Sequence, residues 1–297
     1  IKGQRKSIEL TSDDITLVAR RLVLAGMASY GGDLILAEQT LKRARPIIAE
    51  AISSPYLRPQ AQAVAHTLFS NASALVLAAR GKLDEAEVFM RDAVKKWKPY
   101  KDEIVLGSFD KKISGRQYNW YLRNLTEILI AQGQYVEAEV TARESLLHML
   151  SLYGRYSSYA ASALDLLAKS LLEQGRYEEA GQLAAASIQI YKEVGVKPES
   201  WTLNSARETM ANILVSQGEW EEALEIYTQI EHDLATDLPT FEKYFSGNLN
   251  WAFAQFSTGN IEAAATIAEN IYAKNESLLG KKHYTTAEAL GFLAATQ

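Results

Sequence analysis

A short pattern recurs six times along the 297 residues and restricts the fold more than any other feature of the sequence. It consists of a glycine, any residue, a large apolar residue, two further residues and an alanine. In the clearest copies, Gly175 and Gly218 are followed by Tyr177 and Trp220 as the large residue. A pattern repeated at intervals of this length predicts a chain assembled from copies of one structural unit. The six glycines are Gly32, Gly81, Gly133, Gly175, Gly218 and Gly259, with spacings of 49, 52, 42, 43 and 41 residues.

Apolar residues at helical spacing flank the glycines. Before Gly175 they are Leu164, Leu167 and Leu171, and after it a second stripe begins at Ala180. Spacings of three and four residues place such side chains on one face of a helix. The glycine is expected to end the first helix in a left-handed conformation, and small residues allow the two helices of a pair to approach closely. The small position seven residues before each glycine is occupied by Ala25, Ala74, Thr126, Ala168, Ala211 and Ala252.

The pattern predicts the positions of thirteen helices. Because one helix pair cannot bury its apolar face alone, neighbouring pairs are expected to stack into a continuous core. The prediction is an all-α fold, a single solenoid over residues 1–297 with six helix pairs and the start of a seventh. First helices are expected at about 12–30, 59–79, 117–131, 159–173, 201–216 and 242–257, and second helices at about 34–52, 83–97, 135–150, 177–193, 220–234 and 261–277. The repeats are then 12–52, 59–97, 117–150, 159–193, 201–234, 242–277 and a partial repeat at 284–297.

Two segments depart from the regular pattern. Pro46 falls inside the helix predicted at 34–52, where a proline is expected to kink or split the helix. Residues 99–116 are predicted to form a long connector. Two interpretations of the connector stay open: a loop or short helix that lengthens the solenoid, or a loop that folds over a groove or contacts a partner.

The repeated residues resemble the tetratricopeptide repeat over nearly the whole chain. The small residue, turn glycine, aromatic residue and second alanine of that family match Ala168, Gly175, Tyr177 and Ala180. The same four positions are matched again by Ala211, Gly218, Trp220 and Ala223. This resemblance implies a right-handed α-α superhelix whose first helices line a concave groove.

The repeat length differs from that of the common form of the family. The last copies recur every 41 to 43 residues, whereas the common tetratricopeptide repeat has 34. A period near 42 resembles the kinesin-light-chain-like subtype, and Tyr153-Gly154 resembles its linker. The position where the family commonly has tryptophan departs from the pattern and reads Arg21, Ser70, Leu122, Leu164, Arg207 and Asn248.

Composition and charge exclude several classes of function. The 31 basic and 36 acidic residues give a net charge of −5 without a clustered basic surface, so nucleic acid is not an expected partner. The chain has no apolar stretch long enough to cross a membrane, and the absence of cysteine excludes disulfides and thiolate metal sites. We therefore expect a soluble chain, with the cytoplasm favoured slightly over export. Because the last helix stops at Gln297 within a repeat, we also expect a fragment of a longer protein.

No arrangement typical of an enzyme was found in the sequence. There is no phosphate-binding loop and no Gly-x-Ser-x-Gly nucleophile motif. The four histidines, His66, His148, His232 and His283, lie in separate regions without a second histidine at metal-binding spacing. The prediction is a non-catalytic protein without metal or cofactor.

The resemblance implies a set of groove-facing positions on the first helices. They are polar or aromatic where a core stripe would be aliphatic, and asparagine amides can both donate to and accept from a peptide backbone. The alternative is an inner face that is merely solvated. The Lys–Asn pair that holds C-terminal carboxylates in some members is absent, which favours an internal peptide segment or a folded surface as ligand. The predicted groove residues are Trp120, Arg123, Asn124, Glu127, Asp165, Lys169, Glu208, Asn212, Asn250 and Phe253.

The leading hypothesis is a protein–protein interaction scaffold that binds a peptide segment or partner protein on the concave face. The alternative is the sensing or regulatory arm of a larger multidomain bacterial enzyme, such as a protease or signalling protein, with the catalytic domain outside this segment. A third possibility is self-association through the helix at 284–297, where Leu290 and Leu293 form an apolar stripe.

Overall fold

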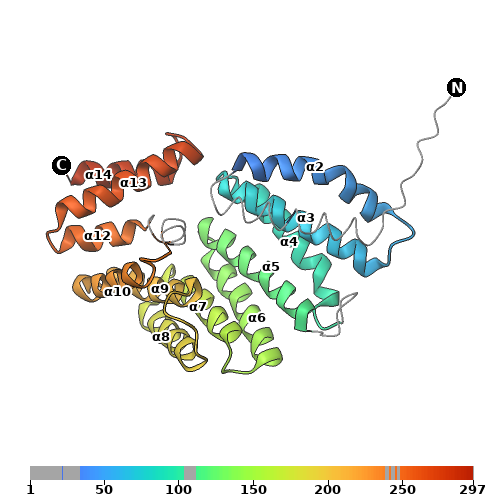
Figure 1. Cartoon of the computed structure of the whole chain (residues 1–297), viewed down its shortest axis with the longest axis horizontal. Coiled ribbons are helices and arrows are strands. Elements are labelled where there is room, and N and C mark those ends of the chain that lie inside the picture. The colour runs from blue at the N-terminus through green and yellow to red at the C-terminus, as the bar shows by residue number, and fades with distance from the viewer. Residues whose placement is uncertain are drawn as a thin grey trace. The chain divides into compact units, whose positions relative to one another are not determined.

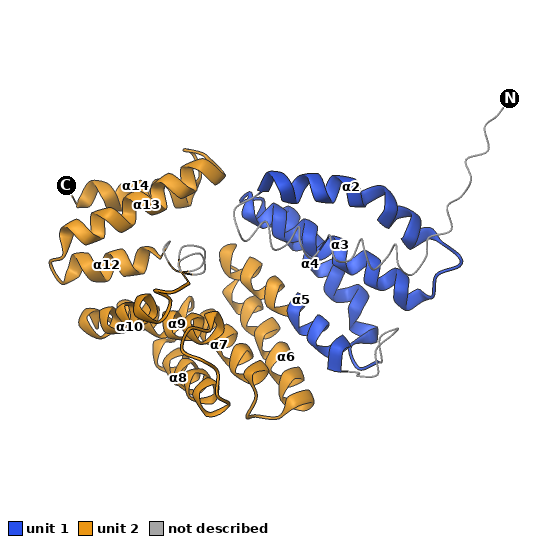
Figure 2. Ribbon diagram, viewed as in Figure 1, with its two compact units in different colours: residues 1–121 blue, residues 122–297 orange. Residues whose placement is uncertain are grey.

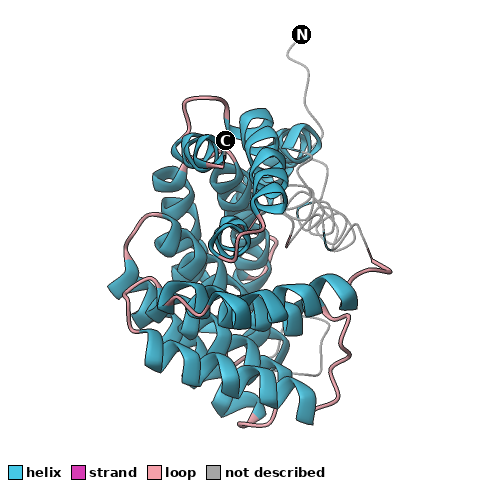
Figure 3. Cartoon of the chain, turned by 90° about the vertical axis from the view of Figure 1, so that its left-hand side faces the viewer, coloured by secondary structure: helices cyan, strands magenta, loops and turns pink. Residues whose placement is uncertain are grey.

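The computed structural model describes residues 22, 34–103, 112–237, 241, 245 and 248–296. Helices and short connections account for this part of the chain, and it contains no β-strand (Figures 1 and 3). The helices are α2 (Leu34–Ser53), α3 (Pro59–Ala79), α4 (Leu83–Trp97), α5 (Lys112–Ala131), α6 (Tyr135–Tyr153), α7 (Ser158–Leu172), α8 (Tyr177–Glu193), α9 (Trp201–Gln217), α10 (Trp220–Asp233), α12 (Leu249–Ser257), α13 (Ile261–Leu279) and α14 (Tyr284–Ala295), with a short 3-10 helix at Lys98–Tyr100.

The observed boundaries follow the repeated pattern closely. The helices α3, α4 and α8 begin and end where the sequence predicts, and α14 begins at the predicted Tyr284. The helix expected at 12–30 lies outside the described residues except for Leu22. The first part of the helix expected at 242–257 is also largely outside them, and the described part, α12, begins at Leu249.

The turn glycines within the described residues have the predicted left-handed conformation, and Gly32 lies outside these residues. Gly175 has φ = +74° and Gly218 has φ = +83°, a region that costs other residues free energy because of their Cβ atom. The N–H of Gly175 donates to Leu172 O at 2.9 Å and that of Arg176 to Leu171 O at 3.1 Å, which together form a Schellman motif. Positive φ angles also occur at the turn glycines Gly81, Gly133 and Gly259.

Small residues lie where paired helices meet. Ala168 on α7 and Ala180 on α8 are both 0% exposed, and so are Ala211 on α9 and Ala223 on α10. Larger apolar side chains surround them in continuous clusters. Close packing of this kind leaves little room for additional methyl groups, so the alanine positions set the distance between paired helices.

The chain divides into two compact units, residues 1–121 and 122–297, called unit 1 and unit 2 below (Figure 2). The boundary falls inside α5, which is continuous from Lys112 to Ala131. A single solenoid over the whole chain stays a prediction.

Unit 1 holds α2, α3, α4 and the first part of α5. The Trp97 indole N–H on α4 donates to Ser114 O at 3.0 Å, and the Tyr121 hydroxyl donates to Thr67 Oγ1 on α3 at 3.0 Å. These buried contacts lie on the first part of α5, which starts five residues before the predicted position 117. The connector is therefore shorter than the predicted 99–116, and residues 104–111 of it lie outside the described residues.

The proline in α2 does not split the helix. Pro46 is exposed, and α2 runs through it without interruption. A proline frees the carbonyl oxygen four residues earlier, here that of Lys42. Because Lys42 is also exposed, water can bond to this oxygen and the helix continues.

In unit 2 the first helices of successive repeats adjoin one another. Helix α7 contacts α9, and α9 contacts α12, in addition to the contacts that each makes with its second helix. This row brings together the polar side chains that the sequence assigns to the inner face.

Candidate functional site

The first polar group of unit 2 joins α7 to α9. The Asp165 carboxylate on α7 is 6% exposed and accepts hydrogen bonds from Thr209 Oγ1 at 2.6 Å and from Ser205 Oγ at 3.2 Å, both on α9. One turn later on α7, Lys169 Nζ lies 3.2 Å from the same carboxylate and donates to Ser205 Oγ at 2.9 Å. The buried charge of Asp165 is therefore both paired and hydrogen-bonded, as a carboxylate away from water requires.

The second polar group joins α9 to the start of α12. Asn248 donates from Nδ2 to Glu208 Oε1 at 2.8 Å and to Asn212 Oδ1 at 2.9 Å. The Tyr227 hydroxyl on α10 donates to the same Asn212 oxygen at 2.6 Å. Asn248 also caps α12, since its Oδ1 accepts from the backbone N–H of Asn250 at 2.9 Å. One side chain thus starts a helix and positions two predicted groove residues.

Glu208 has an unusual electrostatic environment. Burial raises the pKa of its carboxyl to about 7, and the neighbouring charge of Asp165 acts in the same direction. The positive charge of Lys169 and the hydrogen bond from Asn248 lower the pKa but do not outweigh burial. A carboxyl group with this pKa changes its charge near neutral pH.

Arg123 and Trp201 form a further contact between first helices. The Arg123 guanidinium on α5 donates from Nε to Glu127 Oε1 at 3.1 Å. Its Cζ atom lies 4.9 Å from the centre of the Trp201 ring at the start of α9, within the range of a cation–π interaction. Trp201 is 38% exposed, so an aromatic surface adjoins the charged pair.

Three predicted groove residues stand apart from these groups, and a fourth, Asn250, joins them only through its backbone N–H. Trp120 belongs to unit 1, where it stacks on Tyr121 with ring centres 6.0 Å apart. Asn124 is only 2% exposed, so little of its amide is accessible. Phe253 is 42% exposed and lies 4.6 Å from the Phe292 ring of α14. Contact of these three residues with a partner stays a prediction.

Sequence reasoning missed three members of the polar groups: Thr209, Tyr227 and Asn248. Tyr227 lies on a second helix, where the pattern predicts core packing, and it is indeed 2% exposed. Asn248 had a visible signal, because it is polar at a position where the family commonly has tryptophan. Its role depends on contacts across 36 and 40 residues of sequence, to Asn212 and Glu208, which periodicity does not predict.

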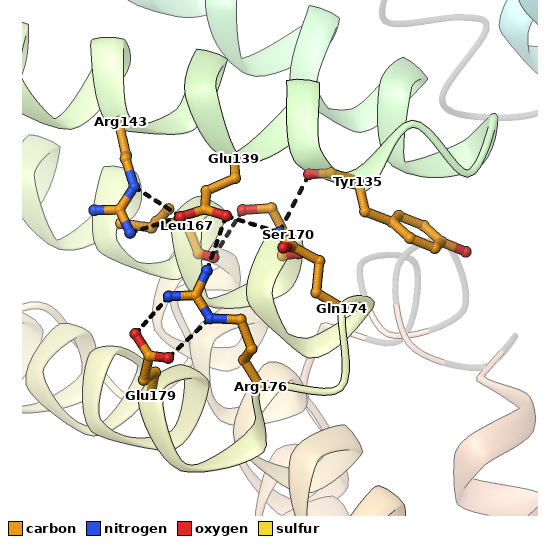
Figure 4. A network of polar contacts seen from close by, with 8 residues as sticks. All are labelled: Tyr135, Glu139, Arg143, Leu167, Ser170, Gln174, Arg176 and Glu179. Carbon is orange, nitrogen blue, oxygen red and sulfur yellow. Dashed lines mark hydrogen bonds and ion pairs between the residues drawn. The ribbon is translucent and has the colours of Figure 1, made fainter.

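Another polar network joins α6, α7 and α8 (Figure 4). Glu139 accepts hydrogen bonds from Arg143 at 2.6 Å, from Gln174 at 3.0 Å and from Arg176 at 3.0 Å, and Arg176 also binds Glu179 at 2.6 Å. Burial raises the pKa of Glu139, but the hydrogen bonds from Gln174, Arg143 and Arg176 outweigh it and leave the pKa lowered. Because all four charged groups are paired, this network fastens helices together and is not a candidate binding site.

The described residues contain no typical catalytic arrangement. The side chains of His66 and Ser70 both contact Asp92 Oδ2, and Ser70 Oγ donates to this oxygen at 3.0 Å. The serine hydroxyl therefore donates to the carboxylate, not to the imidazole that would have to activate it as a nucleophile. In this part of the chain, no three His, Cys, Asp or Glu side chains gather closely enough to hold a metal ion.

Among the described helices, none combines the length and apolar composition needed to cross a bilayer.

Comparison with family models identifies the repeats directly. Models described as tetratricopeptide repeat match residues 160–194, residues 208–238, and residues 72–92 together with 119–144. Among curated protein sequences, none matches this chain significantly.

Several solved structures share the fold at low sequence identity. NprR in complex with its cognate peptide NprX is 14% identical, covers 97% of this chain and 73% of its own, and has a TM-score of 0.59. A signal transduction ATPase of Pyrococcus horikoshii with a tetratricopeptide repeat sensor is 14% identical with a TM-score of 0.56, and covers 96% of this chain but 39% of its own. Repeats of a putative kinesin light chain from Podosopora anserina are 16% identical, cover 74% of this chain and 97% of their own, and have a TM-score of 0.48.

The repeated glycine turns, the buried alanine pairs and the family-model matches on four segments agree with one another. The chain therefore carries tetratricopeptide repeats in these segments, within an all-α fold.

Proposed function

We propose that unit 2 binds an extended peptide segment of a partner through the polar side chains of α5, α7 and α9. The observation that carries this proposal is that predicted groove residues of α7 and α9 hydrogen-bond to side chains at the next first helix along the chain. Asp165 and Lys169 of α7 bind Ser205 of α9, while Glu208 and Asn212 of α9 bind Asn248. We call the surface formed by these residues, with Arg123 and Glu127, the polar face.

The polar face offers groups that an extended backbone can use. Asn212 accepts two hydrogen bonds through Oδ1, and its Nδ2 amide has no acceptor among the described residues. An amide N–H of this kind can donate to a peptide carbonyl. Because Asn248 and Tyr227 already hold the side chain in place, little conformational entropy is lost when a ligand binds.

Neighbouring structures support a peptide or protein ligand. NprR, which shares the fold, is described in complex with its cognate peptide. The Ser205 hydroxyl of the polar face and the Thr209 hydroxyl donate to Asp165, which also pairs with Lys169, so these bonds join α7 to α9.

The test is a selection of peptides of about ten residues from a random displayed library on the intact 297-residue chain. Selected peptides are expected to lose about 10-fold or more in affinity for Asn212→Ala, as loss of a hydrogen bond to a ligand typically costs this much. The matched control carries Glu222→Ala and Glu231→Ala, two exposed positions on α10, and should bind as the unaltered chain does.

Circular dichroism and thermal unfolding establish that each variant is folded before its affinity is compared. Peptides that bind Asn212→Ala with unchanged affinity, or the absence of any selected peptide, would contradict peptide binding on the polar face.

A second candidate function is favoured by one comparison. The Pyrococcus horikoshii protein, described as having a tetratricopeptide repeat sensor, matches nearly all of this chain although the match spans only 39% of its own length. The peptide-binding unit would then be the sensing arm of a larger protein. The coding sequence on both sides of this segment tests the idea, because a catalytic or signalling domain is expected there and its absence would remove this candidate.

A further inference from the structure

The charges of the polar face are unevenly matched. Arg123 is paired with Glu127 at 3.1 Å, and Lys169 is paired with Asp165 at 3.2 Å, in each case one turn apart on the same helix. Glu208 forms no salt bridge with any described residue. The polar face therefore contains two basic and three acidic side chains, and the unmatched charge is that of Glu208.

Glu208 is positioned to accept a ligand. It is only partly exposed, and its Oε1 accepts the Asn248 amide at 2.8 Å. Its second oxygen, Oε2, accepts no hydrogen bond from the described part of the chain. The unused Nδ2 amide of Asn212 belongs to the same face of α9, because residues four positions apart in a helix are neighbours.

The groups around Glu208 make a bound cation favourable. From α7, Asp165 adds negative charge and Lys169, held by Asp165, adds positive charge. The hydroxyl of Tyr227 on α10 also lies nearby. It is neutral, because burial and the charge of Glu208 both raise its pKa. A partly buried carboxylate without a full counter-charge interacts more strongly with an incoming cation than one exposed to water.

We propose that the peptide bound on the polar face carries a positively charged group, a lysine or arginine side chain, that pairs with the Glu208 carboxylate while Asn212 Nδ2 donates to a neighbouring peptide carbonyl. This inference rests on the proposed function. It adds the chemistry of the ligand: a basic residue in the peptide, recognised by charge. Asn248 is a positioning residue, because its amide holds both Glu208 and Asn212 in place.

A proton competes with the cationic group for Glu208. Because burial raises the pKa of Glu208 to about 7, lowering the pH through this value protonates the carboxyl and removes the charge that binds the ligand. Affinity should therefore fall as the pH drops below about 7, by up to about tenfold per pH unit for the single proton involved.

The experiment extends the library selection, carried out at about pH 8 where Glu208 is ionised. Peptides selected by the unaltered chain should be enriched in lysine or arginine at one position, and those selected by Glu208→Gln should not be. For one selected peptide, replacing the basic residue by norleucine or citrulline should weaken binding by about 10- to 100-fold, as should Glu208→Gln, and combining the two changes should cause little further loss.

The pH dependence supplies a second readout. Calorimetric titration of the selected peptide between about pH 6 and 8 should show weakening at low pH for the unaltered chain but a nearly constant affinity for Glu208→Gln. Glutamine has nearly the same size as glutamate and can still accept from Asn248, so this variant is expected to fold.

The outcomes separate the two proposals. Peptides that depend on Asn212 but show no basic enrichment and bind Glu208→Gln equally well would overturn the cation site and leave the proposed function standing. Selected peptides with binding unaffected by Asn212→Ala, or no selected peptides at all, would overturn the proposed function and this inference with it.

Discussion

At the scale of single residues, the ionisation and hydrogen bonding of side chains on the polar face depend on their neighbours more than on the residue type. Asp165 and Glu208 are both carboxylates on first helices of unit 2, yet Asp165 accepts from two hydroxyls and a lysine, whereas Glu208 accepts one amide. Burial of a charged group is tolerated only where hydrogen bonds or counter-charges replace water. Glu208 has one hydrogen bond and no salt bridge in the described part of the chain, so we expect its ionisation to lower the free energy of unfolding.

The stability of the protein should depend on the charge of Glu208. Its pKa in the folded protein, about 7, lies above the ordinary glutamate value of 4.5, so between these values the folded state holds a proton that the unfolded state has lost. The contribution of this group to stability is thus present at pH below about 4.5, declines as the pH rises through 7, and is absent above it.

Glu208→Gln imitates the protonated side chain. We expect it to raise the free energy of unfolding by about 1–3 kcal/mol at pH 8 and to change it little at pH 4.5. Urea unfolding of both chains at the two pH values checks this. If the substitution changes the free energy of unfolding equally at both pH values, the charge of Glu208 is not the cause. A lower free energy of unfolding at pH 8 would contradict the predicted cost of burying this charge.

At the scale of elements, each repeat depends on a turn that glycine makes possible. Gly175 lies in the turn between α7 and α8 with φ = +74°, and a Cβ atom added there would meet nothing within 4 Å. The barrier to substitution is therefore the backbone conformation and not lack of space. Gly181 lies inside α8, where the backbone is helical and the same Cβ atom would also meet nothing within 4 Å.

These two glycines form a matched pair for substitution. Gly175→Ala should lower the free energy of unfolding by about 1–2 kcal/mol, because alanine is strained in the left-handed region. Gly181→Ala should raise it by about 0.5–1 kcal/mol, because alanine favours the helix. Thermal unfolding of both variants decides the matter: effects of the same sign would show that the turn conformation is not what requires glycine at 175.

At the scale of the whole molecule, the chain consists of two compact units whose boundary lies within α5. The helix nearest the end of unit 2, α14, exposes part of its apolar side chains to solvent. Leu290 is 49% exposed, whereas Phe292 is 8% exposed and lies against the ring of Phe253. Contact of this leucine with a second copy of the chain stays a prediction.

Self-association through α14 predicts a dimer that depends on Leu290. Sedimentation should show an oligomer whose population grows with protein concentration, and Leu290→Asp should shift it to the monomer by placing a charge in an apolar contact. Val136→Asp, at an exposed position on α6, serves as the control. A monomer at all concentrations for the unaltered chain would remove this possibility.

The agreement between sequence and structure is best for local features. The ends of α3, α4 and α8 were predicted to the residue, since a turn glycine and helical apolar spacing act within a few positions of the chain. Prediction was less accurate for α5, which begins at Lys112, because buried contacts of Ser114 with Trp97 depend on another helix. Pro46 likewise continues a helix that local rules would interrupt, since its surroundings are exposed.

By itself the sequence determined the repeat, the all-α fold, the resemblance to the tetratricopeptide repeat and a set of polar positions on the expected first helices. Those properties depend on the spacing of glycine, alanine and apolar residues along the chain. Only the tertiary structure decided that Asn248 joins Glu208 to Asn212 and that Lys169 forms a salt bridge with Asp165. It also decided that burial brings the pKa of Glu208 near neutrality. The physical reason is that pairing and desolvation depend on distances between residues about 40 positions apart, which packing of the helices sets.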